Sequence, residues 1–408
     1  MIIKPADRTL SVKEYYFSIK NKEIAKLNAS RPADDPIINL GIGSPDGAPS
    51  QEAVEAMVDC ARKPGTHGYQ SYIGIPQLRE AMAAWYLRWY GVQLDPASEI
   101  QPLTGSKEGI LLTSLTFLNK GDKVLVPNPG YPTYTSATRM CEAEVVSYDL
   151  VEADGWYPNF EQLESMDLSG VKLMWCNYPN MPTGAPAKRE VFEKLVDFAR
   201  RHGILLINDN PYGFVLNTPQ SILSIPGARE CCMEMNSLSK SHNMAGWRVG
   251  MLVGEADVIK EVLKVKSQMD SGMFRGIQEA AVAALNAGPE WYEALNAEYR
   301  RRRELACKIM DTIGCTYDPS AGGLYVWGRV PEIPDLVGDD EGNVMADTDR
   351  PSPAQVLSDK FLYEAGVFLT PGFIFGSNGA NHLRISLCAN VPTLEKALAK
   401  VTFCLNGR

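Results

Sequence analysis

Short apolar runs alternate with longer helix-like stretches through the middle of the chain. The runs lie at residues 124–126, 171–176 and 204–207, and each gives way to a segment rich in Pro, Asn, Asp or Gly. Residues 189–202 show a helical pattern between the second and third runs. Strands that alternate with helices predict βαβ units and an α/β fold with a mostly parallel sheet. Because ligands bind beyond the carboxyl ends of such strands, the residues that follow the runs are the candidates for a site.

The pattern changes towards the end of the chain. A long helix is expected over 290–313, and Gly314 is a good stop signal for it. Short strand-like runs follow at 323–327 and 382–387. Residues 331–353 are acidic and rich in Pro and Gly, which is typical of a surface loop.

This change of pattern predicts two domains. We expect a large domain over 49–304 and a smaller α+β domain built from both ends of the chain, 1–48 and 305–408. The boundary is placed near residue 305, and 45–49 is expected to be the linker that crosses between the domains because it is flanked by prolines.

Composition and charge narrow the class of protein. The chain has 408 residues, of which 45% are hydrophobic and 22% charged, so it is an ordinary globular protein and not a disordered one. Its net charge of −9 argues against a nucleic-acid partner, and the basic run 300–303 is expected to face solvent from within a helix. No internal repeat is visible.

The cysteines and the apolar stretches indicate a compartment. Nine cysteines without a C-x-x-C spacing argue against a disulfide framework or a zinc site and favour a reducing compartment. The first residues lack the apolar core of a signal peptide, and no stretch approaches the ~20 apolar residues of a membrane helix. We therefore expect a cytoplasmic protein with no membrane partner.

The segment 236–250 contains the most suggestive chemistry. Lys240 is suited to a Schiff base, while Ser237 and Arg248 are suited to holding a phosphate. The alternative is a solvated lysine in a serine-rich loop. Residues 237–240 also match the S-x-x-K signature of serine penicillin-binding enzymes, but the chain contains neither the S-D-N nor the K-T-G that this class requires.

Three further polar segments follow expected strands or open expected helices. Gly105, Ser106 and Lys107 open an apolar helix, whose free N–H groups favour an anion, although a simple Ser N-cap is as plausible. Asn180 lies after the run at 171–176 and is suited to binding a ligand oxygen, or to ordinary turn chemistry. Asp209 ends a buried strand, where a carboxylate needs a cationic partner unless it caps a helix.

Taken together, these segments resemble a class I/II aminotransferase of the fold-type I pyridoxal-phosphate (PLP) superfamily. The resemblance covers nearly the whole chain and rests on motifs at 39–46, 74–80, 180–184, 209–212, 237–240 and 383–386. It implies a mostly parallel seven-stranded sheet flanked by helices, PLP as the cofactor, and a homodimer with shared active sites. It also implies transfer of an amino group from an L-amino acid to a 2-keto acid by a ping-pong mechanism.

The resemblance assigns roles around the ring of the cofactor. Lys240 would form the Schiff base and transfer the proton, and Asp209 would pair with the pyridine nitrogen. Asn180 and Tyr212 would hydrogen-bond the phenolic oxygen, and Tyr131 would stack on the ring.

The resemblance also assigns the phosphate and substrate sites. Residues that would hold the phosphate are Gly105, Ser106, Lys107, Ser237 and Arg248, with Tyr69 reaching the phosphate of the partner subunit. Arg384 would bind the substrate α-carboxylate with help from Asn180, and Ile42 and Gly43 would border the substrate.

One motif departs from the family pattern. Where the family usually has Asn-Pro-Thr-Gly, Met181 intervenes between Asn180 and the Pro-Thr-Gly of this chain. Asn180 is the favoured cofactor contact, and Asn177 is the alternative.

Other functions of the same scaffold remain as alternatives. A β-lyase or a decarboxylase would need the same cofactor residues, whereas a PLP-sensing regulator would need a DNA-binding extension that is not visible before residue 40. A dicarboxylate donor would need a second arginine, for which Arg275 is a candidate, although a surface role is favoured. An aromatic cluster at 15–17 either covers the cavity and favours large donors or forms an interdomain contact.

Overall fold

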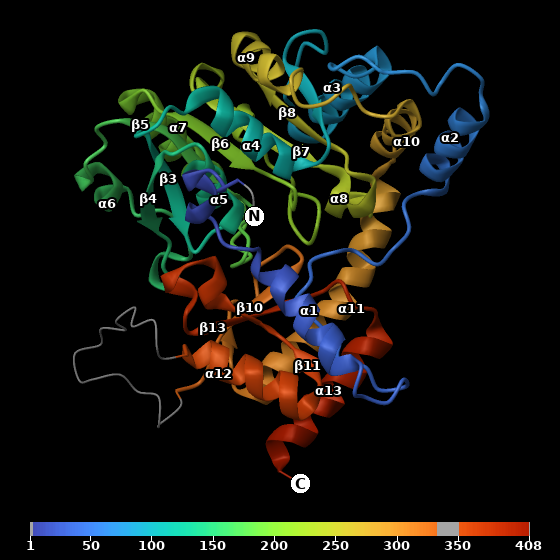
Figure 1. Cartoon of the computed structure of the whole chain (residues 1–408), viewed down its shortest axis with the longest axis vertical. Coiled ribbons are helices and arrows are strands. Elements are labelled where there is room, and N and C mark those ends of the chain that lie inside the picture. Colours follow the sequence, from blue (N-terminus) through green and yellow to red (C-terminus); the bar gives the residue numbers. More distant parts are fainter. Residues whose placement is uncertain (1–2, 333–350, 408) are drawn as a thin grey trace.

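The computed structural model describes residues 3–332 and 351–407, which form two lobes (Figure 1). A large lobe is built around a sheet, and a smaller lobe holds α1 near the start of the chain together with the C-terminal helix. Most of the surface loop expected over 331–353 lies outside the described residues.

A seven-stranded sheet forms the centre of the large lobe within the described chain. Its order is β2-β8-β7-β6-β5-β3-β4, and all neighbours are parallel except β8, which is antiparallel to β2 and β7. The strands are β2 (Ile100–Leu103), β3 (Lys123–Asn128), β4 (Glu144–Asp149), β5 (Val171–Cys176), β6 (Leu205–Asp209), β7 (Cys232–Ser237) and β8 (Gly250–Gly254). The mostly parallel sheet predicted from the alternating runs is confirmed, and so are the three strands themselves.

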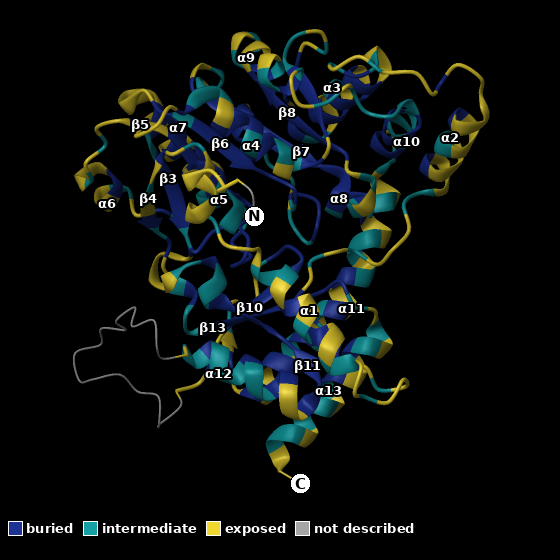
Figure 2. Ribbon diagram, in the orientation of Figure 1, coloured by how far each residue is buried: buried dark blue, intermediate teal, exposed yellow. Residues whose placement is uncertain are grey.

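Both faces of this sheet are covered, which explains the continuous apolar runs. In β5, Trp175 packs into a cluster with the helices on one face, whereas Met174 points into the cluster on the other face. Helices α4, α5 and α9 cover the first face, and α3 and α7 cover the second. The large-lobe helices are α2 (Gln51–Arg62), α3 (Pro76–Tyr90), α4 (Ser106–Phe117), α5 (Pro132–Met140), α6 (Phe160–Ser165), α7 (Arg189–His202), α8 (Leu238–Ser241), α9 (Ala256–Lys266) and α10 (Arg275–Leu285). Figure 2 shows the buried strands between helices that expose their outer sides.

The smaller lobe combines segments from both ends of the chain. An antiparallel sheet of order β12-β13-β10-β9 packs beside a two-stranded parallel pair, β1 and β11. Its elements are α1 (Tyr16–Asn28), β1 (Ile38–Asn39), β9 (Thr316–Tyr317), β10 (Tyr325–Arg329), α12 (Pro353–Lys360), β11 (Val367–Phe368), β12 (Thr370–Pro371), β13 (His382–Ser386) and α13 (Val391–Asn406). The β1–β11 pair ties residues near the start of the chain to residues near its end.

A single helix, α11 (Pro289–Ile313), connects the lobes (Figure 1). Gly314 ends it with a φ of +85°, as predicted from the stop signal. The boundary expected near residue 305 falls inside this continuous helix, and the division into domains at that residue stays a prediction.

The expectation that the basic run 300–303 faces solvent is wrong for Arg302. Its side chain is buried, and its guanidinium donates to Asp46 at 2.6 Å and to Glu298 at 2.9 Å. Four consecutive helical residues span more than one turn, so one of them necessarily points towards the body of the protein. The ion pair with Asp46 thereby fixes α11 to the segment that follows β1.

Candidate active site

A cavity of about 290 Å³ lies where the carboxyl ends of the parallel strands meet the smaller lobe. Its walls come from the loops after β2, β3, β5 and β6, from α8, and from β10 and β13 of the smaller lobe. The lining residues are Tyr15, Phe17, Asn21, Gly41, Ile42, Gly43, Ser106, Lys107, Tyr131, Tyr134, Asn177, Met181, Asp209, Pro211, Tyr212, Ser237, Ser239, Lys240, Ala245, Arg248, Tyr325, Phe375 and Arg384. Most of the residues that the sequence singled out therefore meet in one place.

Asp209 is a buried carboxyl group with one unpartnered oxygen. It is the last residue of β6 and only 4% exposed, so it does not cap a helix. Its Oδ2 accepts a hydrogen bond from the Tyr134 hydroxyl at 2.9 Å, whereas its Oδ1 has no partner among the described residues. Burial raises the pKa of Asp209 to about 6. A buried carboxyl group in this state favours a cationic partner.

Lys240 lies in the same cavity, on the short helix α8. Ser237 caps this helix by accepting from the Ser239 N–H at 3.2 Å. The half-buried side chain of Lys240 donates a hydrogen bond from Nζ to the carbonyl of Gly43. This arrangement differs from a solvated loop lysine, since the amine is directed into an enclosed space opposite the segment that follows β1.

A candidate anion site lies at the N-terminus of α4. Gly105 is its N-cap, with φ +91° and no capping side chain, so Ser106 is the first helical residue and not the cap. The position favours glycine because a φ of +91° strains any other residue, and a Cβ atom there would also lie 2.1 Å from Nη2 of Arg248, whose side chain would have to move. Desolvation and repulsion from Arg248 lower the pKa of Lys107. Two neighbouring cations beside free backbone N–H groups are suited to a phosphate.

Arg384 is a buried cation from the smaller lobe. It lies on β13 and is 3% exposed, with Nη2 donating to the Gly41 carbonyl at 2.7 Å. Its Nη1 lies 3.3 Å from Sδ of Met181, and its Nε has no partner within the described residues. No carboxylate of the described chain forms an ion pair with it. The guanidinium therefore has donor capacity left with which it could bind an anionic ligand.

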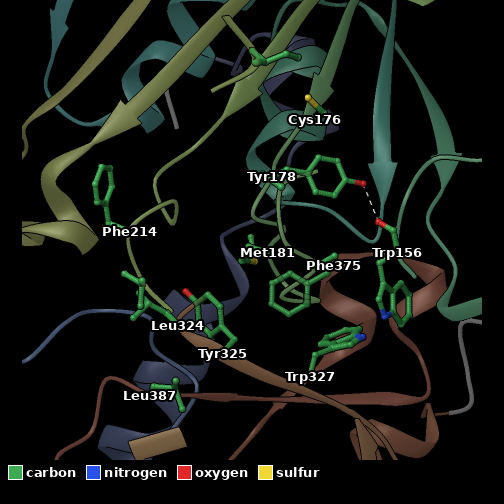
Figure 3. Packing of buried hydrophobic residues seen from close by; sticks show 14 of the residues in the cluster. Trp156, Cys176, Tyr178, Met181, Phe214, Leu324, Tyr325, Trp327, Phe375 and Leu387 are labelled. Atoms are coloured by element: carbon green, nitrogen blue, oxygen red, sulfur yellow. Dashed lines mark hydrogen bonds between the residues drawn. The ribbon is translucent and has the colours of Figure 1, made fainter. Parts of the chain in front are cut away.

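The turn after β5 places Asn177 and Met181, rather than Asn180, at the cavity wall. Asn180 accepts hydrogen bonds through Oδ1 from the Thr183 hydroxyl at 2.8 Å and donates to the Asn177 carbonyl, so its amide serves the turn. Asn177 lines the cavity and donates to the backbone carbonyl of Asp209. Tyr178 points the other way and donates to the Trp156 carbonyl at 2.8 Å (Figure 3). The geometry thus favours Asn177 over Asn180 as a ligand contact.

Besides Gly105 and Asn180, three of the expected residues stay away from the cavity lining. Tyr69 is 93% exposed between α2 and α3. Arg275 pairs with Glu279 at 2.8 Å on α10. In the aromatic cluster at 15–17, Tyr15 and Phe17 line the cavity, whereas the Tyr16 ring packs against Phe373.

Sequence reasoning missed several residues that line the site. Tyr134 holds Asp209, while Tyr325 and Phe375 pack against Arg384 with ring centroids 3.9 and 4.6 Å from its guanidinium carbon. The periodicity of α5 could have shown that Tyr134 faces the sheet, but no sequence signal joins Phe375 to Arg384.

Within the described residues, no cluster of three or more His, Cys, Asp or Glu side chains is suited to a metal ion. In the same residues, no helix has both the length and the apolar character needed to cross a bilayer. None of the nine cysteines, all of which lie in the described part of the chain, forms a disulfide.

Comparison with known proteins shows that this chain is similar to aminotransferases over most of its length. The family profile described as aminotransferase class I and II matches residues 35–401. The LL-diaminopimelate aminotransferase of Oleidesulfovibrio alaskensis is 38% identical over 400 residues, covering 97% of this chain and 98% of that protein. The enzyme of the same name from Nitratidesulfovibrio vulgaris is 38% identical over 402 residues, covering 98% of each chain.

Solved structures of similar proteins share the fold of this chain over nearly its whole length. Substrate-bound BacF from Bacillus subtilis superposes with a TM-score of 0.88 at 35% identity, covering 98% of each chain. Aspartate aminotransferase from Thermus thermophilus with maleate gives a TM-score of 0.85 at 27% identity, covering 98% of this chain and 99% of that one. The matches span the whole fold and include the strand ends that form the cavity. This chain therefore belongs to the class I and II aminotransferases and is a PLP-dependent enzyme that transfers amino groups.

Proposed function

We propose that amino transfer takes place in the cavity at the strand ends, with Lys240 as the lysine that binds the cofactor covalently. The observation that carries this proposal is the pairing of two features in one cavity. The amine of Lys240 is directed into it, and Oδ1 of Asp209 is buried there without a partner. A cofactor with an aldehyde and a cationic ring nitrogen would satisfy both groups.

The remaining proposed contacts are with the phosphate and the ring of the cofactor. Phosphate would bind at the N-terminus of α4, between the backbone of 105–107 and the side chains of Ser237 and Arg248. Tyr131 and Tyr212 line the same cavity as Asp209. For the phenolic oxygen we propose Asn177 together with Tyr212, because both line the cavity and Asn180 does not.

The chain's own residues would then perform the proton transfers. When bound, PLP accepts the electron pair that remains after the α-proton of the amino acid is removed. Nζ of Lys240 would take this proton from the α-carbon and return a proton later in the half-reaction, a role typically worth ~10²–10⁴-fold in rate. Asp209 would keep a proton on the ring nitrogen by remaining negatively charged beside it.

Arg384 would orient both substrates through the α-carboxylate. A guanidinium pairs with a carboxylate through two parallel hydrogen bonds, which fixes the α-carbon relative to Lys240. Since the cavity has one such arginine, donor and acceptor would occupy it in turn, as a ping-pong mechanism requires.

Assembly and location are part of the proposal. A homodimer with shared active sites would explain why Tyr69 is fully exposed in one subunit, since it would contact the phosphate of the partner. A cytoplasmic location is supported by nine cysteines without a disulfide.

Borohydride reduction tests the central assignment. Reduction of the purified, cofactor-loaded enzyme followed by peptide mapping should give a reduced adduct on Lys240. Lys240→Ala should lose this adduct and lower kcat by at least about 10⁴-fold, because it removes both the attachment point and the proton carrier. The matched control is Lys264→Ala, an exposed lysine paired with Glu261. An adduct on any other lysine would contradict the proposal.

A further inference from the structure

The part of the cavity around Arg384 is lined by apolar groups. We call Tyr15, Phe17, Met181, Tyr325 and Phe375 the aromatic chamber. These five residues come from four separate places: the segment that begins α1, the turn after β5, β10, and the segment after β12. Figure 3 shows Met181, Tyr325 and Phe375 next to one another.

The chamber closely surrounds the guanidinium of Arg384. The ring centroids of Tyr325, Phe375 and Phe17 lie 3.9, 4.6 and 5.5 Å from its central carbon. Sδ of Met181 adds a polarisable contact at 3.3 Å from Nη1. An amino acid held by its carboxylate at Arg384 would therefore place its side chain against aromatic rings and a thioether.

Charge in the cavity is unevenly distributed. Among the described residues that line it, Asp209 carries the one carboxyl group, and this group accepts a hydrogen bond from Tyr134. The cations other than Arg384 are Lys240 and the pair at the anion site, Lys107 and Arg248. None of the five chamber residues is charged, and besides Arg384 one cation, Lys107, is seen in contact with a chamber ring, that of Tyr15, among the described residues.

This distribution discriminates between classes of amino acid. A substrate with a second ammonium group at the end of its side chain, such as LL-diaminopimelate, would bury that charge without an anion. A dicarboxylic substrate such as aspartate would bury a second carboxylate without a second arginine. Burying an unpaired charge is strongly unfavourable, whereas an aromatic side chain gains both apolar contact and ring packing.

Tyr15 and Phe17 close the chamber from the N-terminal side. Their ring centroids lie 5.6 Å apart, and Nζ of Lys107 lies 4.6 Å from the Tyr15 ring centroid. The Tyr15 ring thus packs against Lys107 of the anion site, while the Phe17 ring packs against Arg384.

We propose that the preferred donor is a monoamino monocarboxylic L-amino acid with an aromatic or large apolar side chain, accommodated by the aromatic chamber. This inference rests on the proposed function of Lys240 and Arg384, and it names the substrate class of that same site. It also separates this chain from the relatives named for LL-diaminopimelate, although they share its fold.

Single half-reactions of the loaded enzyme test the proposal without a keto-acid partner. The absorbance of the bound cofactor is followed after mixing with L-phenylalanine, L-leucine, LL-diaminopimelate or L-aspartate at varied concentration. We expect the second-order rate constant for L-phenylalanine to exceed those for LL-diaminopimelate and L-aspartate by at least about 100-fold, since unpaired buried charge gives large discrimination.

A chamber variant links this preference to the named residues. Phe17→Ala should lower the ratio of the rate constants for L-phenylalanine and L-alanine by about tenfold, and Phe17→Leu by less. The ratio is the readout because a general loss of folding or of Arg384 geometry lowers both constants together. Phe403→Ala is the control, since Phe403 is 72% exposed on α13, and it should leave the ratio unchanged.

The outcomes separate the two proposals. Faster reaction with LL-diaminopimelate or L-aspartate than with L-phenylalanine would overturn the substrate class while leaving the role of Lys240 intact. An unchanged ratio in both Phe17 variants would remove that residue from the chamber. If no amino acid changes the absorbance and no reduced adduct forms on Lys240, the proposed function itself fails.

Discussion

The two ends of the cavity are built in different ways. At the cofactor end, Asp209, Ser237 and the turn at 105–107 follow directly from strands of one parallel sheet. At the substrate end, Arg384 meets Phe17 and Phe375, which come from the opposite end of the chain and from the segment after β12. The cofactor end is thus fixed by a single sheet, whereas the substrate end depends on how segments far apart in the sequence pack together within the smaller lobe.

This contrast indicates that the cofactor end determines the chemistry and the substrate end determines which substrate is bound. Groups at the ends of buried strands keep their geometry because the sheet cannot shift without breaking its core. Groups from a second lobe can be exchanged without disturbing that sheet, so one scaffold can serve many amino acids. Changes at the cofactor end should therefore alter cofactor binding and every reaction, and changes at the substrate end should alter substrate binding or preference without loss of the cofactor.

Asp209→Asn should have the largest effect of the changes that follow. An amide carries no negative charge to match a protonated ring nitrogen, so kcat should fall by roughly 10²–10³-fold for every donor. Steady-state kinetics with at least two donors would measure this. A loss confined to one donor would contradict the idea that this end of the cavity serves all substrates equally.

Asp209 should also make the stability of the cofactor-free protein depend on pH. Because burial raises the pKa of Asp209 from 3.8 to about 6, the folded state binds its proton more tightly than the unfolded chain. Its contribution to stability is therefore fully present below pH 4 and is lost as the pH rises through 6, to an extent of about 3 kcal/mol.

Thermal unfolding of cofactor-free protein between pH 4 and pH 8 measures this contribution. Asp209→Asn should be more stable than the parent protein at pH 8 and similar to it near pH 4, since the amide resembles the protonated carboxyl group. A difference between the two proteins that does not change with pH would contradict the assignment.

Arg384→Ala tests the substrate end. It should raise KM for amino donors and keto acids so that kcat/KM falls by about 10²-fold, because a buried carboxylate would lose its partner. The amount of bound cofactor should remain that of the parent enzyme. Arg189→Ala is a matched control, since this arginine pairs with Glu193 on the surface of α7. Loss of the cofactor in Arg384→Ala would show that the two ends are not independent.

Tyr134→Phe should have the smallest effect, and it again concerns the cofactor end. The change removes the hydrogen bond to Oδ2 of Asp209, so the pKa of that carboxyl should rise further and cofactor affinity should fall by about tenfold. Tyr148→Phe is the control, because it deletes a similar buried hydrogen bond at 2.7 Å to the Trp175 carbonyl. Equal cofactor affinities in the two variants would exclude a specific role for Tyr134.

The sequence by itself determined the elements and much of the cofactor end. Continuous apolar runs followed by turn residues are sufficient to locate β3, β5 and β6, and the residue types after such strands indicate the chemistry. Asp209 was found in this way and Lys240 from the residue types of the segment 236–250, and both line the cavity. These inferences succeed because periodicity and turn chemistry are properties of neighbours along the chain.

Only the tertiary structure decided which of several similar residues face the cavity. Asn177 and Asn180 belong to one turn, and the fold of that turn, not the motif, places Asn177 at the cavity wall and Asn180 away from it. Arg302 lies in a run of arginines, yet its partner Asp46 is 256 positions away in the sequence. The contact of Phe17 with Arg384 likewise depends on how α1 packs on β13. Such contacts depend on the packing of distant segments, which local patterns of the sequence do not encode.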